Sequence, residues 1–503
     1  MLDQLLLGFI DAFTLTNLIY IMVGITLGIT IGAIPGLGSV TALAVLIPVS
    51  YYMPPLSAIA FLVGVNKGGT SGGAIPAILL NSPGTPEAAA TALDGHPMAK
   101  RGEPQRAMKF ALYSSVTGDT ISDVLLIFLV VPVAAIALQF GPLEFTTVMI
   151  FAFSLLAGIS GGSLIKGIIP IIVGVFLSTI GLDPMDSSAR MTFGTVYLFD
   201  GLPLIAVAIG CLALASVVEQ IFDLWRAGGE TKLKVSVDET VINSKLPLRE
   251  FFSYWRTIVR SALIGSGIGM LPGLGVTLAA FLSYGAARRA SKNPENFGTG
   301  EPTGIVATEA ANSAVVGANL VPTIALGIPG NIAAALLISA FIIHGIVPGP
   351  FMLTMHGDIV YALFASMIMA NFVHLAIGRI GIPIWAKIAS APRGLILPAV
   401  VVMCIVGVYL PGQSMFEVGV MLVFAGVGLL MRRTGFSVVC LVIGFILGDM
   451  FETSLRQSLL LYKSDYSAIA QSPIAMCFLG LTAFVIIRAS WREIKIVIGK
   501  QLF

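Results

Sequence analysis

The chain has 503 residues, of which 56% are hydrophobic and only 11% are charged, and its formal net charge is +2. Because a soluble domain carries roughly 25% charged residues, this composition excludes a soluble globular protein and indicates a polytopic membrane protein in contact with lipid. The small net charge gives no indication of a nucleic-acid partner. The four cysteines lie in apolar runs without Cys-x-x-Cys spacing, which favours core packing over a disulfide or metal site.

Apolar stretches of about 17–25 residues, long enough to cross a bilayer, follow one another along the whole chain. They predict an all-α fold with roughly 10–12 transmembrane segments. In chain order, we expect an interfacial helix at 1–13, a first membrane repeat at 14–222, a cytoplasmic linker at 223–250, a second membrane repeat at 251–490 and a cytoplasmic tail at 491–503. The first residues lack a basic region and a cleavage site, so we expect no removable signal peptide.

Three landmarks recur in the same order in the two halves, which indicates an internal duplication. They are a Pro-Gly-Leu-Gly turn at 35–38 and 272–275, an asparagine at Asn66 and Asn312, and an apolar segment broken by two prolines at 75–86 and 321–331. A proline-broken helix is tolerated in a membrane only where the freed backbone is buried in protein or lines a cavity. Two such segments at matching places point to the binding site of a transporter.

Basic residues predict the orientation of the chain, because cytoplasmic loops are rich in Lys and Arg. Basic loops flank the second Pro-Gly-Leu-Gly turn, and the roughly 30 apolar residues between them are too few for two crossings. We therefore expect a re-entrant hairpin with its tip at Pro272, Gly273 and Gly275. The matching loops of the first half have the opposite charge bias, so the halves are expected to be inverted repeats, with the first tip at Pro35, Gly36 and Gly38. The stretches 183–190 and 449–456 are expected to be external loops.

Each break restarts a helix at membrane depth, where the free N–H groups of a helix start suit a carboxylate. Candidate substrate-binding residues at the two breaks are Asn81, Ser82, Gly84, Thr85, Gly327, Pro329, Gly330 and Asn331. Carbonyl oxygens freed at the breaks and tips suit Na⁺. Candidate Na⁺ ligands are Gly36, Asn66, Gly273, Glu309 and Asn312. The alternative is that the breaks are structural kinks, with Glu87 satisfying one helix start.

A stretch of small and polar residues precedes the first break and is expected to line the same cavity. It supplies Asn66, Lys67, Thr70 and Ser71, and the second half supplies Asn312 and Ser313. A lysine is costly in lipid, so Lys67 either binds a substrate carboxylate or pairs with an acid such as Glu87.

Other ionisable residues within apolar runs are less informative. Asp119 and Asp123 share a helix face, and they either line an ion path or lie partly exposed at the membrane interface. His344, His356 and His374 show no metal-binding spacing and are expected to be ordinary polar residues.

Three other functions are compatible with parts of the pattern. An ion channel or a stand-alone ion antiporter fits the repeats and broken helices, but no ring of filter-like residues is present. The sequence Gly69-Thr70-Ser71-Gly72 fits the nucleophile motif of rhomboid-type intramembrane proteases, which also need a histidine on a neighbouring helix. No phosphate-binding loop of the Gly-x-x-x-x-Gly-Lys type occurs, so the chain is not expected to be an ATPase or any other enzyme.

Several longer motifs together resemble the large membrane subunit of the tripartite tricarboxylate transporter family. They are Gly32–Gly38, Pro76–Pro86, Asp94–Ala99, Glu309–Ser313, Pro322–Gly330 and Gly345–Pro350. The resemblance covers nearly the whole chain and implies a multi-pass secondary transporter of the elevator type in a bacterial inner membrane. It would import di- or tricarboxylates with a cation gradient, commonly Na⁺, and without another cofactor.

The resemblance also implies partners. These are a small membrane subunit and a periplasmic solute-binding protein that delivers the carboxylate. The transport domain would slide against a scaffold that holds either a homodimer or the small subunit. The family more often has an aromatic or small residue at the position of Lys67, so the identity of the carboxylate stays open.

Overall fold

The computed structural model of the chain describes residues 8, 10–159, 164–226, 246–272, 275–389, 393–463 and 467–501. These residues are mostly helical, and the strands among them are the short antiparallel pair β1 (Gly181–Leu182) and β2 (Ala189–Arg190). Seven helical stretches in the described ranges are long and apolar enough to cross a membrane. They are Leu15–Gly32, Pro104–Ala137, Leu204–Arg226, Gly357–Ala389, Met415–Thr434, Val438–Leu461 and Pro473–Trp491. The prediction of an all-α polytopic membrane protein is confirmed, and the total number of crossings stays a prediction.

Some predicted segments lie partly outside the described residues. Of the interfacial helix expected at 1–13, the structure describes residue 8 and residues 10–13, and of the linker it describes 223–226 and 246–250. The tip residue Gly273 also lies outside the described residues.

The described chain forms two compact units, and each draws on both halves of the sequence. The first unit consists of Met1–Val133, Ser216–Leu271 and Gly275–Gly407, and the second of Ala134–Ala215, Pro272–Leu274 and Val408–Phe503.

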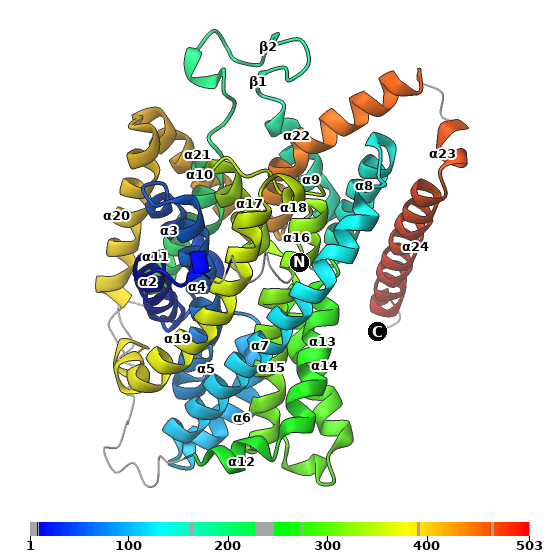
Figure 1. Ribbon diagram of the computed structural model, residues 1–503. Helices are drawn as coiled ribbons and strands as arrows, with labels where there is room; N and C mark the ends of the chain where they lie inside the picture. The colour runs from blue at the N-terminus through cyan, green and yellow to red at the C-terminus, as the bar shows by residue number, and fades with distance from the viewer. Residues whose placement is uncertain are drawn as a thin grey trace. The chain divides into compact units, whose positions relative to one another are not determined.

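Apart from Pro272–Leu274 of the second turn, which are part of the second unit, the first unit contains the landmarks of both sequence halves, in the same order of elements (Figure 1). The first half supplies α2 (Leu15–Gly32), α3 (Ser39–Ser50), α4 (Pro55–Gly72), α5 (Ala74–Leu80), α6 (Ala88–Lys100) and α7 (Pro104–Ala137). The second half supplies α12 (Leu248–Phe252), α13 (Trp255–Gly269), α14 (Gly275–Ala290), η3 (Pro294–Asn296), α15 (Pro302–Ala318), α16 (Leu320–Leu326), α17 (Ile332–Ile343), α18 (Met352–Met355), α19 (Gly357–Ala389) and α20 (Arg393–Gly412). In each half a helical hairpin leads to a helix, a short helix, a break, a further helix and one very long helix.

Contacts between the halves of the first unit are reciprocal. Helix α3 of the first half packs on α17 of the second, and the corresponding helix α14 of the second half packs on α6 of the first. Helices α4 and α15, which correspond to each other, also contact each other directly. Such reciprocity is the pattern that two repeats related by a two-fold axis produce.

Glycines bring the hairpin helices of the first unit unusually close to their neighbours. A Cβ atom on Gly28 of α2 would lie 2.4 Å from the carbonyl oxygen of Val65 in α4. In the second half, a Cβ atom on Gly265 of α13 would lie 2.2 Å from the carbonyl oxygen of Ala311 in α15. Small residues at helix contacts give close backbone packing inside a membrane, where the hydrophobic effect does not drive helices together. The α2–α4 and α13–α15 contacts are therefore equivalent.

The second unit contains the helices that follow the long helix of each half. They are α8 (Pro142–Ile159), α9 (Leu164–Ser178), η1 (Val196–Leu198), α10 (Leu204–Ala208), the π-helical η2 (Ile209–Leu214), α21 (Met415–Thr434), α22 (Val438–Leu461), α23 (Ser467–Gln471) and α24 (Pro473–Gln501). The η2 segment continues into α11 (Ala215–Arg226). Helices α9 and α22 pack closely, since a Cβ atom on Gly174 would lie 2.2 Å from the carbonyl oxygen of Leu441.

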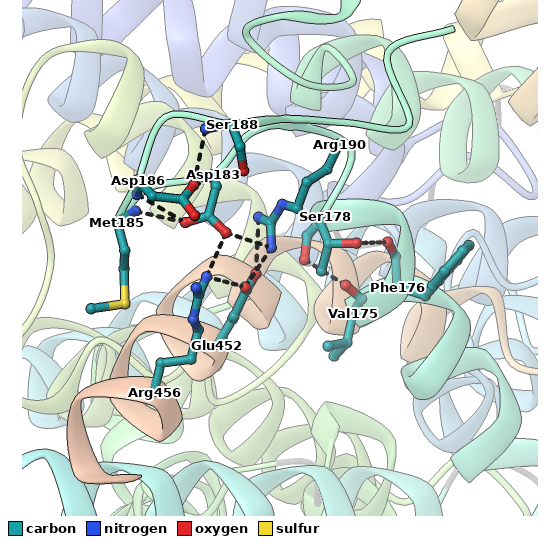
Figure 2. Close-up of polar contacts among 11 residues, drawn as sticks. Val175, Phe176, Ser178, Asp183, Met185, Asp186, Ser188, Arg190, Glu452 and Arg456 are labelled. Atoms are coloured by element: carbon teal, nitrogen blue, oxygen red, sulfur yellow. Dashed lines mark hydrogen bonds and ion pairs between the residues drawn. The ribbon is translucent and has the colours of Figure 1, made fainter. Parts of the chain in front are cut away.

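A four-residue ion-pair network joins the β1–β2 loop to α22 within the second unit (Figure 2). Arg190 Nη1 lies 2.6 Å from Glu452 Oε1, and Arg456 Nη1 lies 2.6 Å from Asp183 Oδ2. The hydrogen bond from Arg456, with a further one from the Met185 N–H group, lowers the pKa of Asp183 to about 2. The expectation of an external loop at 449–456 is wrong, because these residues extend α22 and present their charged side chains to the loop.

The glycine packing of the first unit predicts a contrast between two positions on α13. Gly265→Ala places a methyl group against the backbone of α15 and should lower the stability of the protein by ~1–3 kcal/mol. Gly267 has no atom within 4 Å of the equivalent Cβ position, so Gly267→Ala should cause no loss. Thermal unfolding of the purified protein in detergent measures both variants. Equal midpoints for the two variants would contradict this account of the packing.

Candidate functional site

The first predicted break lies between α5 and α6, where the chain leaves one helix and starts another. Asn81 ends α5 in a left-handed conformation with φ of 51°. Asparagine tolerates this conformation better than most residues, and it is a common helix ending. The Thr85 hydroxyl group then accepts a hydrogen bond from the Ala88 N–H group, at 3.4 Å. Thr85 thus accepts a hydrogen bond from the first residue of α6, as a cap would, but α6 begins at Ala88 with Glu87 at the N-cap position, two residues after the predicted one, and Asn81 lies at the end of α5.

The second break, between α16 and α17, repeats this geometry with different residues. Gly327 ends α16 with φ of 71° and stands at the position that corresponds to Asn81. Asn331 then caps α17, because its side-chain oxygen accepts a hydrogen bond from the Ala334 N–H group at 2.9 Å. The predicted capping role of Asn331 is confirmed. Both breaks therefore expose the end of one helix and the start of another within a few residues.

In each half, the last residue of the first hairpin helix lies against the break. A Cβ atom on Gly84 would lie 2.7 Å from the carbonyl oxygen of Gly32, and one on Gly38 would lie 2.4 Å from Thr85 Cγ2. In the second half, a Cβ atom on Gly330 would lie 2.8 Å from the carbonyl oxygen of Gly269. The predicted tip residues Gly36 and Gly275 have positive φ, at 81° and 76°. In the first half the predicted tip residue Gly38 thus contacts the break, and in the second half the end of α13 does so.

The paired asparagines are buried but incompletely hydrogen-bonded. Asn66 and Asn312 are each 1% exposed. Among the described residues, Asn66 Oδ1, both side-chain polar atoms of Asn312 and Ser313 Oγ have no hydrogen-bond partner. Buried polar atoms usually have a partner, and leaving one without costs roughly 1–3 kcal/mol. These atoms are therefore suited to a polar ligand or water.

Lys67 is completely buried and is paired with acids other than the one expected. Its Nζ atom lies 2.7 Å from Asp123 Oδ2 and 3.6 Å from Asp119 Oδ1, and it donates a hydrogen bond to Asn371 Oδ1 at 2.8 Å. The suggested pairing with Glu87 is therefore wrong, because α7 places two carboxyl groups beside α4. The alternative that Asp119 and Asp123 are partly exposed is also wrong, since they are 0% and 1% exposed.

One contact of this site was not anticipated. Ser71 Oγ lies 2.7 Å from Nε2 of His374 in α19, and both side chains are buried. Spacing offers a signal for it: Lys67 and Ser71 are four residues apart on α4, and Asn371 and His374 are three apart on α19, so each pair shares a helix face. The two helices are far apart in the sequence, so the spacing does not indicate that these two faces contact each other. Thr70, the remaining predicted residue of this stretch, is 3% exposed and also lies in α4.

A further buried carboxyl group, that of Glu309, lies in α15 without a basic partner among the described residues. Glu309 Oε2 accepts a hydrogen bond from Ser115 of α7 at 2.8 Å, and Oε1 accepts one from Thr91 of α6. Thr91 also contacts Thr308, at 2.9 Å between the hydroxyl oxygens. Glu87, at the start of α6, lies close to the hydroxyl groups of Thr85 and Thr277, which agrees with its expected place at the helix start. Helix α6 thus joins the first break to the buried acid of the second half.

Comparison with known proteins bears on what this arrangement does. The sequence model of the tripartite tricarboxylate transporter TctA family matches residues 18–443. The chain belongs to this family. An uncharacterized 52.8 kDa protein of Agrobacterium vitis, from the TAR-I ttuC' 3' region, is 32% identical over 488 residues, which are 97% of this chain and 96% of that protein. Another A. vitis protein, from the TAR-II ttuC' 3' region, is 34% identical over 231 residues, which are 46% of this chain and 96% of that protein.

No solved structure matches the chain. Membership of the TctA family identifies it as a multi-pass membrane subunit of a transporter, in agreement with its seven apolar helices. This confirms the resemblance inferred from the motifs, and a transporter family fits the expectation that the chain is not an enzyme.

The cap at the second break is open to a direct test. Asn331→Ala removes the hydrogen bond to the Ala334 N–H group and should lower the stability by about 1 kcal/mol. Asn331→Ser retains a capping oxygen and should lie close to the wild type. Thermal unfolding in detergent provides the measurement. If the serine variant is as unstable as the alanine variant, the side chain does not act as a cap.

Proposed function

We propose that the chain is the large membrane subunit of a binding-protein-dependent secondary transporter that imports di- or tricarboxylates. The observation that carries the proposal is the duplicated break, in which Thr85 and Asn331 each accept a hydrogen bond from the start of the following helix and each break lies against the end of a glycine-rich hairpin helix. A helix start presents unpaired N–H groups and about half a positive charge, so two of them can bind a multivalent carboxylate with few basic side chains. Membership of the TctA family supports the same substrate class.

The proposed substrate cavity is lined by the breaks and by α4 and α15. Asn66, Asn312 and Ser313 supply buried polar atoms that lack partners among the described residues. Lys67 is not proposed as a direct substrate ligand in the state described, since its ammonium group is held by Asp123 and Asn371. Selectivity for the carboxylate would therefore rest on helix starts and amides.

A cation gradient, with Na⁺ as the coupling ion, is the proposed driving force. Glu309 is a buried carboxyl group that contacts hydroxyl groups rather than a basic residue. Glu309 and Asn312, with carbonyl oxygens of the tips, would provide the oxygen ligands that hard cations prefer. The sequence pattern indicates a cation site at the carbonyl groups of the paired breaks. The proposal adds the side chains of Glu309 and Asn312 to that site.

The proposed movement is of the elevator type, in which a domain of hairpins and broken helices slides against a scaffold. The reciprocal packing of α3 on α17 and of α14 on α6 supports inverted repeats related by a two-fold axis. The partners would be a small membrane subunit and a periplasmic binding protein, the location a bacterial inner membrane, and the scaffold either dimeric or joined to the small subunit.

The contact between Ser71 and His374 favours a second candidate function, that of an intramembrane protease. It supplies the serine and the histidine that an intramembrane protease needs, at 2.7 Å. A protease would cleave a membrane substrate, and Ser71→Ala would abolish that cleavage. A channel or stand-alone antiporter would move ions without a binding protein or a carboxylate.

Reconstituted uptake separates these functions. Proteoliposomes containing this subunit and the small subunit should accumulate a di- or tricarboxylate only with the cognate binding protein and an inward Na⁺ gradient, and accumulation should saturate. Asn312→Ala should reduce uptake at least tenfold while the protein still inserts, because it removes a central polar group, whereas the peripheral variant Gly267→Ala should transport normally. Full uptake by Asn312→Ala and by Asn81→Ala would contradict the site, and uptake without a binding protein would contradict the mechanism.

A further inference from the structure

A buried layer formed by Lys67, Asp119, Asp123 and Asn371 contains more negative than positive groups. Lys67 comes from α4, Asp119 and Asp123 come from α7 one helical turn apart, and Asn371 comes from α19. All four side chains are buried, at 2% exposure or less. If both carboxyl groups were ionised, one ammonium group would face two negative charges with no contact to solvent.

The two carboxyl groups of this layer are not equivalent. Asp123 Oδ2 lies 2.7 Å from Lys67 Nζ and accepts a second hydrogen bond from Asn371 Nδ2, also at 2.7 Å. Asp119 lies beyond hydrogen-bond distance of Lys67, at 3.6 Å, and among the described residues neither of its oxygens has a hydrogen-bond partner. Asp123 is therefore the counter-ion of Lys67, and Asp119 is the surplus carboxyl group.

Among the described residues, no positively charged group other than Lys67 compensates a negative charge on Asp119. The ionisable groups that face this layer are Lys67 from α4, Asp123 from α7 itself and His374 from α19. His374 lies against the Ser71 hydroxyl group, and its Nδ1 atom has no hydrogen-bond partner in the part of the chain that the structure describes. Helix α15 approaches the layer at Gly317, whose missing side chain leaves room for Asp123 Oδ1. Lys67 is shared with Asp123, so an ionised Asp119 at 3.6 Å would leave the buried layer with a net negative charge. A buried uncompensated charge is far more costly than a neutral carboxyl group, so the site selects a single positive charge.

We propose that Asp119 is a proton-binding site, and that the native protein holds this proton beside the Lys67–Asp123 ion pair at neutral pH. The bound proton brings the layer to zero net charge. Because the layer connects α4, which leads into the first break, with the two long helices α7 and α19, a movement of α4 that separates Lys67 from Asp123 would change the affinity for the proton. The exchange of this proton during transport rests on the proposed function, whereas the proton site itself does not.

The site is tested on the full-length protein in lipid nanodiscs by infrared difference spectroscopy. The spectrum of the wild type minus that of Asp119→Asn should contain the C=O stretching band of a protonated carboxyl group at neutral pH. The control Ser114→Ala, which removes another buried polar group of α7 without a partner among the described residues, should leave this band in place. A wild-type spectrum without a band that Asp119→Asn removes would overturn the proposal.

Thermal unfolding provides a second readout that separates a proton from a bound metal ion. Asparagine resembles the neutral acid, so Asp119→Asn should unfold close to the wild-type midpoint at neutral pH, while Asp123→Asn, which removes the direct counter-ion of Lys67, should unfold lower. The wild type should lose stability as the pH rises, because its native state holds a proton that the unfolded chain has released, and Asp119→Asn should lose less. An increase of the wild-type midpoint by Na⁺ that Asp119→Asn abolishes would assign the site to Na⁺ and overturn the proton.

The coupling step is read from transport. Carboxylate uptake by the wild type should respond to an inward proton gradient, and uptake by Asp119→Asn should not. If the infrared band is present but the wild type ignores the proton gradient, the coupling is wrong and the proton site stands. If the wild type transports no carboxylate at all, the proposed function fails, and the infrared result still decides the site.

Discussion

Where a helix is interrupted inside a bilayer, the N–H and C=O groups freed at the interruption need other hydrogen-bond partners. Much of the structure of the first unit provides such partners. In both halves the chain meets it with a residue of positive φ at the end of one helix and a side-chain cap at the start of the next. The caps differ in chemistry, Thr85 in one half and Asn331 in the other, but act on the N–H group three residues later. Satisfied in this way, the breaks can lie in the interior and leave helix starts available to a charged ligand.

Close glycine packing makes this interior possible. The ends of the hairpin helices reach the breaks only because Gly38, Gly84 and Gly330 leave room for backbone and side-chain atoms at contact distance. The same device holds α2 on α4 and α13 on α15. Since lipid offers no hydrophobic gain for helix association, these contacts depend on shape and on polar pairs such as that between Lys67 and Asp123.

The sequence was sufficient to predict the fold class, the order of the breaks and tips, and the capping residues, because each depends on local chemistry. Proline, glycine and a following Thr or Asn limit the backbone wherever they occur. The partners of Lys67 were predicted wrongly because they depend on which helix faces which, and a pattern within one helix does not contain that information. Asp119 and Asp123 share a face in any helix, but only the packing of α7 against α4 decides that this face meets a lysine. The contact between Ser71 and His374 was not anticipated for the same reason.

The central claim is that the two breaks face one substrate cavity, and cysteine labelling tests it most directly. In a background without the four native cysteines, Ser82→Cys at the first break and Leu326→Cys at the second would each be exposed to a water-soluble maleimide in reconstituted transporter. The account predicts that both positions are labelled and that the transported carboxylate protects both. Labelling that the carboxylate leaves unchanged at either position would contradict it.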